Sequence, residues 1–405
     1  MINIIRSVAV AVAVVVLSLA APALADSIHP DLKRSQVITL DVAAIERNAQ
    51  SGNPFELALG DKRLNVVLTP ASVWPKEGLT ILEIQKDGST TKRVVQGNIT
   101  YAGEIVGEDP KVGEARFTIA GGVLLGSVRT SAGWWFIEPL ARFAPKADTS
   151  QYVVYETRDV NLKMAFGSDG VRSNVLSDPT PPFTCPPQDN RISVAMVADR
   201  EYFNQHLNGP LTYWQQQTAL VNEISGIYEQ DQFKKKFRLG LSMVDSNGVF
   251  LQSTDPEMLL AELDLLVDPW LNQLQDLCSH LVHLTSGKEL DGPVLGIANQ
   301  PGWTGLTQQV LGNNEFLYYQ NYIVAAHEIA HNFDAIHAEA EEWCEPIPED
   351  PFHCRWRRTL DFESFDAVTI VSEFSDGLSS NGTIQECKNN VQRMRAKMAQ
   401  RHLWP

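Results

Sequence analysis

Three histidines and one glutamate lie close together in residues 327–337. His327 and His331 are four residues apart, so on a helix they project from one face, one turn above the other. Two imidazoles at that spacing bind a single ion, and zinc is the usual choice for a neutral-imidazole site with an open position. His337 lies six residues farther on, which requires the helix to end and the chain to fold back. Three histidines plus water indicate an open, reactive zinc site rather than a closed structural one.

Glu328 follows the first of these histidines and lies about 100° around a helix from it. There it is outside the ligand face but close enough to accept a proton from a water molecule at the ion. The competing interpretation makes each histidine an ordinary surface or core residue. A His-Glu-x-x-His sequence with a third histidine at a fixed distance occurs by chance in roughly one of several thousand such chains. The metal-site interpretation is therefore favoured.

A helix over Phe316–Asn332 is expected to carry the first two histidines. The apolar residues Tyr322, Ala326, Ile329 and Phe333 fall within one narrow arc, and the histidines point to nearly the opposite side. We therefore expect one face of this helix to pack on a core while the other faces a cleft.

Strands and helices alternate in the chain before that helix, which indicates an α/β layer. The expected strands are Ile192–Ala198, Phe237–Val244, His280–Leu284 and Pro293–Ala298, and the expected helices are Leu211–Gln230 and Pro256–Leu277. A capping box formed by Thr254 and Glu257 is expected to begin the second helix. His280 and His283 face opposite sides of a strand, which favours core or surface positions over metal binding.

The first half of the chain has a different pattern, with short alternating stretches separated by glycines. Ala115–Ile119 and Val123–Val128 flank Gly121-Gly122, which is a hairpin signal. This half contains no cluster of His, Cys or paired carboxylates. Residues 167–190 are rich in Ser, Asp, Pro and Gly, which predicts an exposed linker and a target for proteases. We therefore expect a β-rich domain at 26–166, this linker, and an α/β domain at 191–405.

An export signal is predicted at the N-terminus. Arg6, the apolar run Val8–Ala20 and the sequence Ala23-Leu24-Ala25 are typical of a secretory signal peptide over residues 1–25. The run is too short for a spanning helix, although an uncleaved anchor is the alternative. We expect a secreted or periplasmic protein without a membrane span. The net charge of −16 argues against nucleic acid or an anionic membrane as a partner, and the oligomeric state stays open.

Five cysteines in an exported chain suggest disulfides with one thiol left over. Cys344 and Cys354 are near enough for a local bridge, and Cys278 and Cys387 are then available for a second one. On that pairing Cys185 is the odd cysteine. Sequence alone does not decide the connectivity.

The histidine-rich stretch at 327–337 resembles the metzincin pattern HExxHxxGxxH, and His-Asn-Phe at 331–333 looks like the reprolysin and ADAM branch. Residues 281–298 look like the strand and the substrate-binding edge strand that precede the zinc helix in that family. Residues 101–140 are similar to the reprolysin propeptide. The resemblance implies an α/β (α+β) zincin catalytic domain with a mixed sheet and a long active-site helix, preceded by a β-rich prodomain.

Two positions depart from the family pattern. Asp334 replaces the glycine at which the helix turns toward the third ligand, and it requires a left-handed backbone at a cost of roughly 1–2 kcal/mol. Val371 stands where the family has the methionine that forms an apolar floor under the zinc ligands. Both changes weaken the site without removing a ligand or the base.

The resemblance implies a secreted zinc metalloendopeptidase that hydrolyses a protein or peptide substrate. One catalytic Zn²⁺ would be held by His327, His331 and His337, with Glu328 as general base. The edge strand near Pro293–Ala298 would hold an extended peptide.

The resemblance also implies that residues 26 to about 190 form an inhibitory prosegment. Cys185 is the cysteine expected to fill the fourth zinc position, because a thiolate is a strong zinc ligand. An ordinary disulfide at Cys185 is the alternative.

Other functions stay open. The changes at Asp334 and Val371 suit an inactive pseudoprotease that binds a partner, although the intact Glu328 argues against it. A zinc hydrolase of another substrate class is a third possibility. The acidic run Glu339–Asp350 is a possible Ca²⁺ site, but a solvated loop is favoured.

Overall fold

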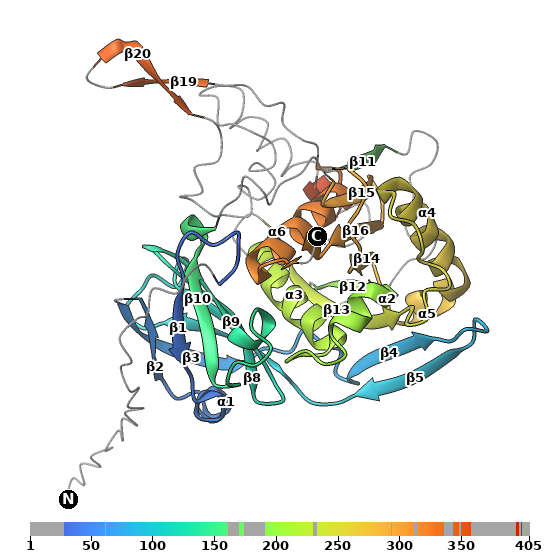
Figure 1. The fold of residues 1–405 in the computed structure, drawn as a ribbon, viewed down its shortest axis with the longest axis horizontal. Helices are drawn as coiled ribbons and strands as arrows, with labels where there is room; N and C mark the ends of the chain where they lie inside the picture. The colour runs from blue at the N-terminus through green and yellow to red at the C-terminus, as the bar shows by residue number, and fades with distance from the viewer. Residues whose placement is uncertain are drawn as a thin grey trace, which may run out of the picture.

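The computed structural model describes residues 28–60, 62–160, 170–173, 191–229, 233–292, 294–311, 314–335, 343–347, 350–357, 394–396 and 398. Within these residues the fold is mixed α/β and contains two eight-stranded sheets. The first sheet forms one lobe, and the second sheet with most of the helices forms the other (Figure 1).

The first sheet is antiparallel throughout and comes from the N-terminal half of the chain. Its order is β1-β10-β9-β8-β7-β6-β3-β2. The strands are β1 Gln36–Thr39, β2 Phe55–Leu59, β3 Lys62–Pro70, β6 Thr100–Ile105, β7 Glu114–Ala120, β8 Val123–Thr130, β9 Gly133–Pro139 and β10 Gln151–Glu156. Helix α1, Val42–Ser51, packs on one face and closes a separate apolar core with it.

The hairpin predicted around Gly121-Gly122 is confirmed as the turn between β7 and β8. Gly121 and Gly122 have φ angles of 59° and 78°. Two successive positive φ angles are what a two-residue hairpin turn needs, and glycine adopts them without steric cost.

The second sheet is mixed and has the order β11-β15-β16-β14-β12-β13-β4-β5. Its central strands β16, β14, β12 and β13 run parallel, while β15 is antiparallel to β16. The bounds are β12 Arg191–Ala198, β13 Lys236–Val244, β14 Leu281–Ser286, β15 Gly296–Gln300 and β16 Thr304–Gln308. Strands β12, β13 and β14 agree with predicted ones, β15 is displaced toward the C-terminus from its prediction, and β16 was not predicted. Short hairpins follow at β17 Val310–Leu311 with β18 Asn314–Glu315, and at β19 Trp343–Ile347 with β20 Asp350–Arg357.

Strands from outside the predicted α/β domain complete this second sheet. The hairpin of β4, Leu79–Ile84, and β5, Thr90–Val95, leaves the N-terminal lobe and pairs in parallel with β13. Figure 1 shows this light-blue hairpin extending away from its own lobe along the second one. Strand β11, Gly170–Ser173, comes from the predicted linker and pairs with β15. The two halves are therefore joined by shared strands.

The helices of the second lobe are α2 Arg200–Gln205, α3 Tyr213–Tyr228, α4 Pro256–Val267, α5 Leu271–Asp276 and α6 Tyr318–Asn332. The prediction of one helix over Pro256–Leu277 is wrong, because a 3-10 turn at Asp268–Trp270 separates α4 from α5. Pro269 has no N–H and collides with the carbonyl one turn back, so an α-helix does not continue through it.

The predicted capping box at the start of α4 is also wrong. The N-cap is Asp255, whose side chain accepts a hydrogen bond of 2.9 Å from the Met258 amide, with Pro256 at the first helical position. Aspartate is a strong N-cap, and proline is favoured at the position that follows it.

Helices α3 and α6 lie between the two sheets. Helix α3 contacts β7, β8 and β13, and α6 contacts β9, β15 and β16. A single apolar core runs from the inner face of the first sheet through these helices into the second sheet. In the described part of the chain, no helix is long and apolar enough to cross a membrane.

Candidate metal centre

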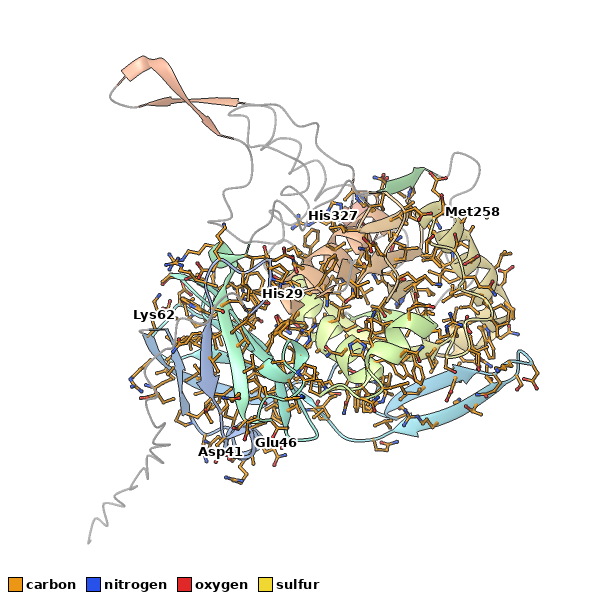
Figure 2. The ribbon with its side chains drawn as sticks, in the orientation of Figure 1. His29, Asp41, Glu46, Lys62, Met258 and His327 are labelled. Carbon is orange, nitrogen blue, oxygen red and sulfur yellow. The ribbon has the colours of Figure 1, made fainter. Side chains whose placement is uncertain are left out.

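Helix α6 brings His327, Glu328 and His331 together. The three side chains belong to residues that are at most 2% exposed. Every residue of α6 is buried, so the predicted amphipathic helix with one face in an open cleft is not what the structure contains. The reason is its position between two sheets, which covers the helix from both sides. Figure 2 shows His327 near the boundary of the two lobes.

The two histidine rings converge at one point. Their Nε2 atoms are 2.8 Å apart, and their planes are nearly perpendicular with centroids 4.4 Å apart. The Nδ1 atom of His331 lies 2.7 Å from the carbonyl oxygen of Ala335, so it must carry the proton and donate it. That tautomer leaves the Nε2 lone pair for a metal, and a backbone carbonyl in this role is typical of zinc-bound histidines. The donor set of these two residues fits a zinc ion.

The end of α6 turns back on itself at Asp334. This residue has a φ of 73°, as the predicted left-handed turn requires. The Asp334 amide donates to the His331 carbonyl over 2.8 Å, and the Ala335 amide donates to the Ala330 carbonyl over 3.1 Å. Together these bonds form a Schellman motif with Asp334 in the position that glycine usually occupies. The motif places the Ala335 carbonyl beside the His331 ring.

Strand β15 approaches the Glu328 carboxylate at Gly296. A Cβ atom added to Gly296 would lie 2.5 Å from Oε1 of Glu328. Real Cβ atoms essentially never make contacts that short, so any larger residue at this position requires the strand or the Glu328 side chain to shift. Sequence reasoning placed the edge strand here but did not single out Gly296. A glycine in a strand that otherwise reads as buried was the available signal, because it marks a close approach of the backbone to another group.

Asn332 ties the end of α6 to the adjoining ends of strands β15 and β16. Its side-chain nitrogen donates to the carbonyl oxygens of Asn299, at 3.1 Å, and Thr304, at 2.8 Å. The side chain of Gln300, the last residue of β15, donates to the Ala335 carbonyl. These bonds fix strand β15 relative to the histidines. Asn332 entered the sequence analysis only as part of the family likeness, and a buried amide on an apolar helix was the signal for its structural role.

Three of the predicted site residues, His337, Val371 and Cys185, lie outside the described residues. Among the residues that are described, no three His, Cys, Asp or Glu side chains form a group able to hold a metal. His327, Glu328 and His331 are therefore the part of the predicted site that the structure places together.

The other predicted histidines are core residues. His280 is 8% exposed and accepts a 3.0 Å hydrogen bond from the Ser193 amide through Nδ1. His283 is fully buried with its Nε2 atom 2.7 Å from the hydroxyl of Thr307, and burial lowers its pKa to about 3. Neither residue belongs to the site on α6.

Cys278 is a buried free thiol, so the Cys278–Cys387 bridge considered above is not formed. The elimination that made Cys185 the odd cysteine therefore fails. The strands β19 and β20 place Cys344 opposite Trp356 and Cys354 opposite Pro346, and the local bridge between these two cysteines stays a prediction.

Residues 188–354 match the metallo-peptidase family M12. This match supports a metallopeptidase domain over that part of the chain, which contains all the residues of the site that the structure places together. The crystal structure of metalloproteinase-II from Bacteroides fragilis is similar over 74% of this chain and 86% of that chain, with 12% sequence identity and a TM-score of 0.41. No curated protein matches the chain.

Proposed function

We propose that the chain is a secreted, zinc-dependent metalloendopeptidase. The observation that carries this proposal is the convergence of the His327 and His331 Nε2 atoms, 2.8 Å apart, on the helix that also holds Glu328. The match to the metallo-peptidase family over residues 188–354 supports it. His337 is the third ligand in this proposal, and an N-terminal signal peptide over residues 1–25 directs export to the periplasm or beyond.

Glu328 has the position and the chemistry of a general base. A zinc ion at the histidines would supply acidity to a water molecule and polarise the scissile carbonyl. Glu328 accepts the proton of the attacking water and then delivers it to the leaving amine. The close approach of Gly296 limits the space around the Glu328 carboxylate on the side of strand β15. His331 is kept in its ligating tautomer by the Ala335 carbonyl.

Strand β15 is the surface on which we propose that a peptide substrate binds. It is antiparallel to β16 on one side, and its other side is paired with β11. The pairing joins Gly170 to Ile297 and Ser173 to Gln300. Strand β11 belongs to the predicted linker, residues 167–190, which is called the connecting segment below. It uses the backbone groups that an extended peptide would use, which supports β-augmentation as the binding mode. It also supports a latent state in which substrate must displace β11.

Cys185 is proposed as an additional inhibitory ligand, with an ordinary disulfide as its alternative. The test compares the activity of the uncleaved wild type with that of Cys185→Ser. A more active variant is expected if the thiolate fills the open zinc position. A variant as latent as the wild type, or a disulfide at Cys185 found by mass spectrometry, would leave β11 as the inhibitory element.

The decisive test of the proposed function is digestion of an unstructured protein such as casein, with and without a chelator. We expect cleavage that the chelator abolishes and zinc restores, and none by Glu328→Ala. A wild type that binds zinc, has its linker cut and still cleaves no peptide would favour the pseudoprotease. Hydrolysis of a non-peptide ester without peptide cleavage would favour another class of zinc hydrolase.

A further inference from the structure

The first turn of α6 is capped by side chains of the N-terminal sheet. The first amides of a helix have no partner inside it. The Tyr318 amide donates to the Glu138 carboxylate over 2.9 Å, and the Tyr319 amide donates to the Tyr155 hydroxyl over 3.2 Å. The Tyr155 hydroxyl itself donates to Glu138. The N-cap residue, Leu317, has no side chain able to accept these bonds, so α6 depends on strands β9 and β10 for its N-terminus.

Glu138 is completely buried and forms an ion pair with Arg142. Arg142 also donates to the carbonyl oxygen of Phe316 over 3.1 Å, just before the helix begins. A carboxylate at this end of a helix is stabilised by the helix dipole as well as by the amides. The pair therefore fixes the start of α6 in a place where water does not compete for the hydrogen bonds.

An aromatic cluster extends this contact along α6 toward the histidines. Phe136 of β9 stacks on Tyr322 at 5.5 Å between centroids and on Tyr155 at 5.6 Å. Trp134 lies 5.6 Å from the same Tyr322 ring. Tyr322 precedes His327 by little more than one turn, so the N-terminal sheet supports the helix almost as far as its first zinc ligand.

A second contact joins α3 to strands β7 and β8. Arg116 of β7 donates to the Asn222 carbonyl at 3.2 Å, and Asn222 donates back to the Phe117 carbonyl at 3.2 Å. The helix comes so close at Gly226 that an added Cβ would lie 2.4 Å from Nε of Arg116. With the β4–β5 hairpin on β13 and an apolar core that contains residues of both halves, these contacts join the two halves on several elements.

We propose that residues 28–160 remain part of the working protein after the connecting segment is cut, and that Glu138 is a positioning residue for helix α6. The positioning role of Glu138 rests on the proposed peptidase function, whereas the retention of residues 28–160 does not. Loss of this region would leave the N-terminal amides of α6 uncapped, the aromatic rings exposed and the edge of β13 open. Only strand β11 of the connecting segment has to leave β15 for substrate to bind.

Retention is tested by cutting the chain at a sequence-specific protease site placed within residues 174–190. We expect the two fragments to elute together from a sizing column in native buffer, at the volume of the intact chain, and to separate in concentrated urea. Separation in native buffer would overturn the retention proposal. This result is independent of any peptidase activity.

Positioning is tested with Glu138→Ala, Glu138→Gln and the matched control Glu104→Ala, which removes an exposed carboxylate from the same sheet. We expect Glu138→Ala to speed amide hydrogen exchange across residues 318–324 and to lower kcat about tenfold with little change in KM. Glu138→Gln keeps an acceptor oxygen and should recover part of both effects.

Tyr155→Phe keeps the aromatic cluster and removes only the hydroxyl, so it tests the cap if Glu138→Ala does not fold. It should speed exchange at the Tyr319 amide selectively. The positioning role of Glu138 would be overturned if Tyr155→Phe and a folded Glu138→Ala exchanged their amide hydrogens at the same rates as Glu104→Ala. Faster exchange in a chain without peptidase activity would keep the cap and refute the proposed function instead.

Discussion

Glu328 is the residue whose replacement separates metal binding from chemistry. We expect Glu328→Gln to keep the metal, because His327 and His331 supply the convergent nitrogens. Hydrolysis should fall by about 10²–10⁴-fold, the range over which a general base contributes. Metal analysis of the purified protein together with a peptide cleavage assay measures both. Undiminished activity in Glu328→Gln, or full activity in metal-free wild type, would contradict the assignment.

Asp334 tests the turn that ends α6. Its φ of 73° is a conformation that glycine adopts without strain. Asp334→Gly should therefore raise the free energy of unfolding or leave it unchanged, and should preserve zinc affinity. Asp334→Val should lower the unfolding free energy by about 1–3 kcal/mol, since a β-branched residue tolerates positive φ poorly. Urea denaturation of both variants measures the difference, and equal stabilities would show that the turn does not limit the fold.

Sequence reasoning worked best for residues whose side chains carry the chemistry. The spacing of His327, Glu328 and His331 was enough to place them on one helix. Gly296 and Asn332 were missed as site residues. Gly296 acts through the absence of a side chain, and the Asn332 amide acts by donating hydrogen bonds to backbone carbonyls. Both roles depend on which strand lies beside α6, and residue types alone do not contain that information.

The approach of strand β15 to α6 makes a prediction at the scale of elements. Gly296→Ala should displace either the strand or the Glu328 carboxylate, since the new methyl group would meet Oε1 at 2.5 Å. We expect kcat to fall about tenfold or more, because a displacement of this size misaligns the base. Gly209→Ala is the matched control, for an added Cβ there meets nothing closer than 3.5 Å. Equal kcat values for the two variants would mean that strand β15 moves to accommodate the methyl group without displacing Glu328.

Elements with a regular pattern were predictable, and their interruptions were less so. Strands β12, β13 and β14 follow from runs of buried apolar residues. The helix break at Pro269 was overlooked because the apolar pattern continues through it, although proline chemistry predicts a break there. The partner of the β4–β5 hairpin was not predictable, because alternation indicates a strand without indicating the sheet that it joins.

The junction between the two lobes predicts a pH dependence for the whole molecule. Glu223 on α3 accepts a 2.8 Å hydrogen bond from Ser127, and burial raises its pKa to about 8 from an ordinary value of 4.5. Arg116, Arg129 and Glu114 are the charged groups that face it. The folded state holds this proton more tightly than the unfolded state does. The contribution of Glu223 to the free energy of unfolding is therefore fully present below pH 4.5 and is lost as the pH rises to about 8.

Glu223→Gln isolates this contribution. Between pH 4.5 and 8 the unfolding free energy of the wild type should decline, relative to the variant, by up to about 1.4 kcal/mol per pH unit. Denaturant titrations across that range measure the two curves. Parallel curves would show that Glu223 is ionised in the folded protein and that its neighbours compensate the charge.

The pairing of β4 with β13 has a consequence for the order in which the molecule forms. Thr80 pairs with Leu241, so the second sheet joins segments from opposite halves of the chain. Pairings this distant in sequence require a large loop to close first, which slows folding. The first sheet can form as soon as its own strands exist, but the β4–β5 hairpin, which lies between two of those strands in sequence, cannot pair until β13 is available. During that interval both β4 and β13 present unpaired edges, which makes it the stage of folding most exposed to aggregation.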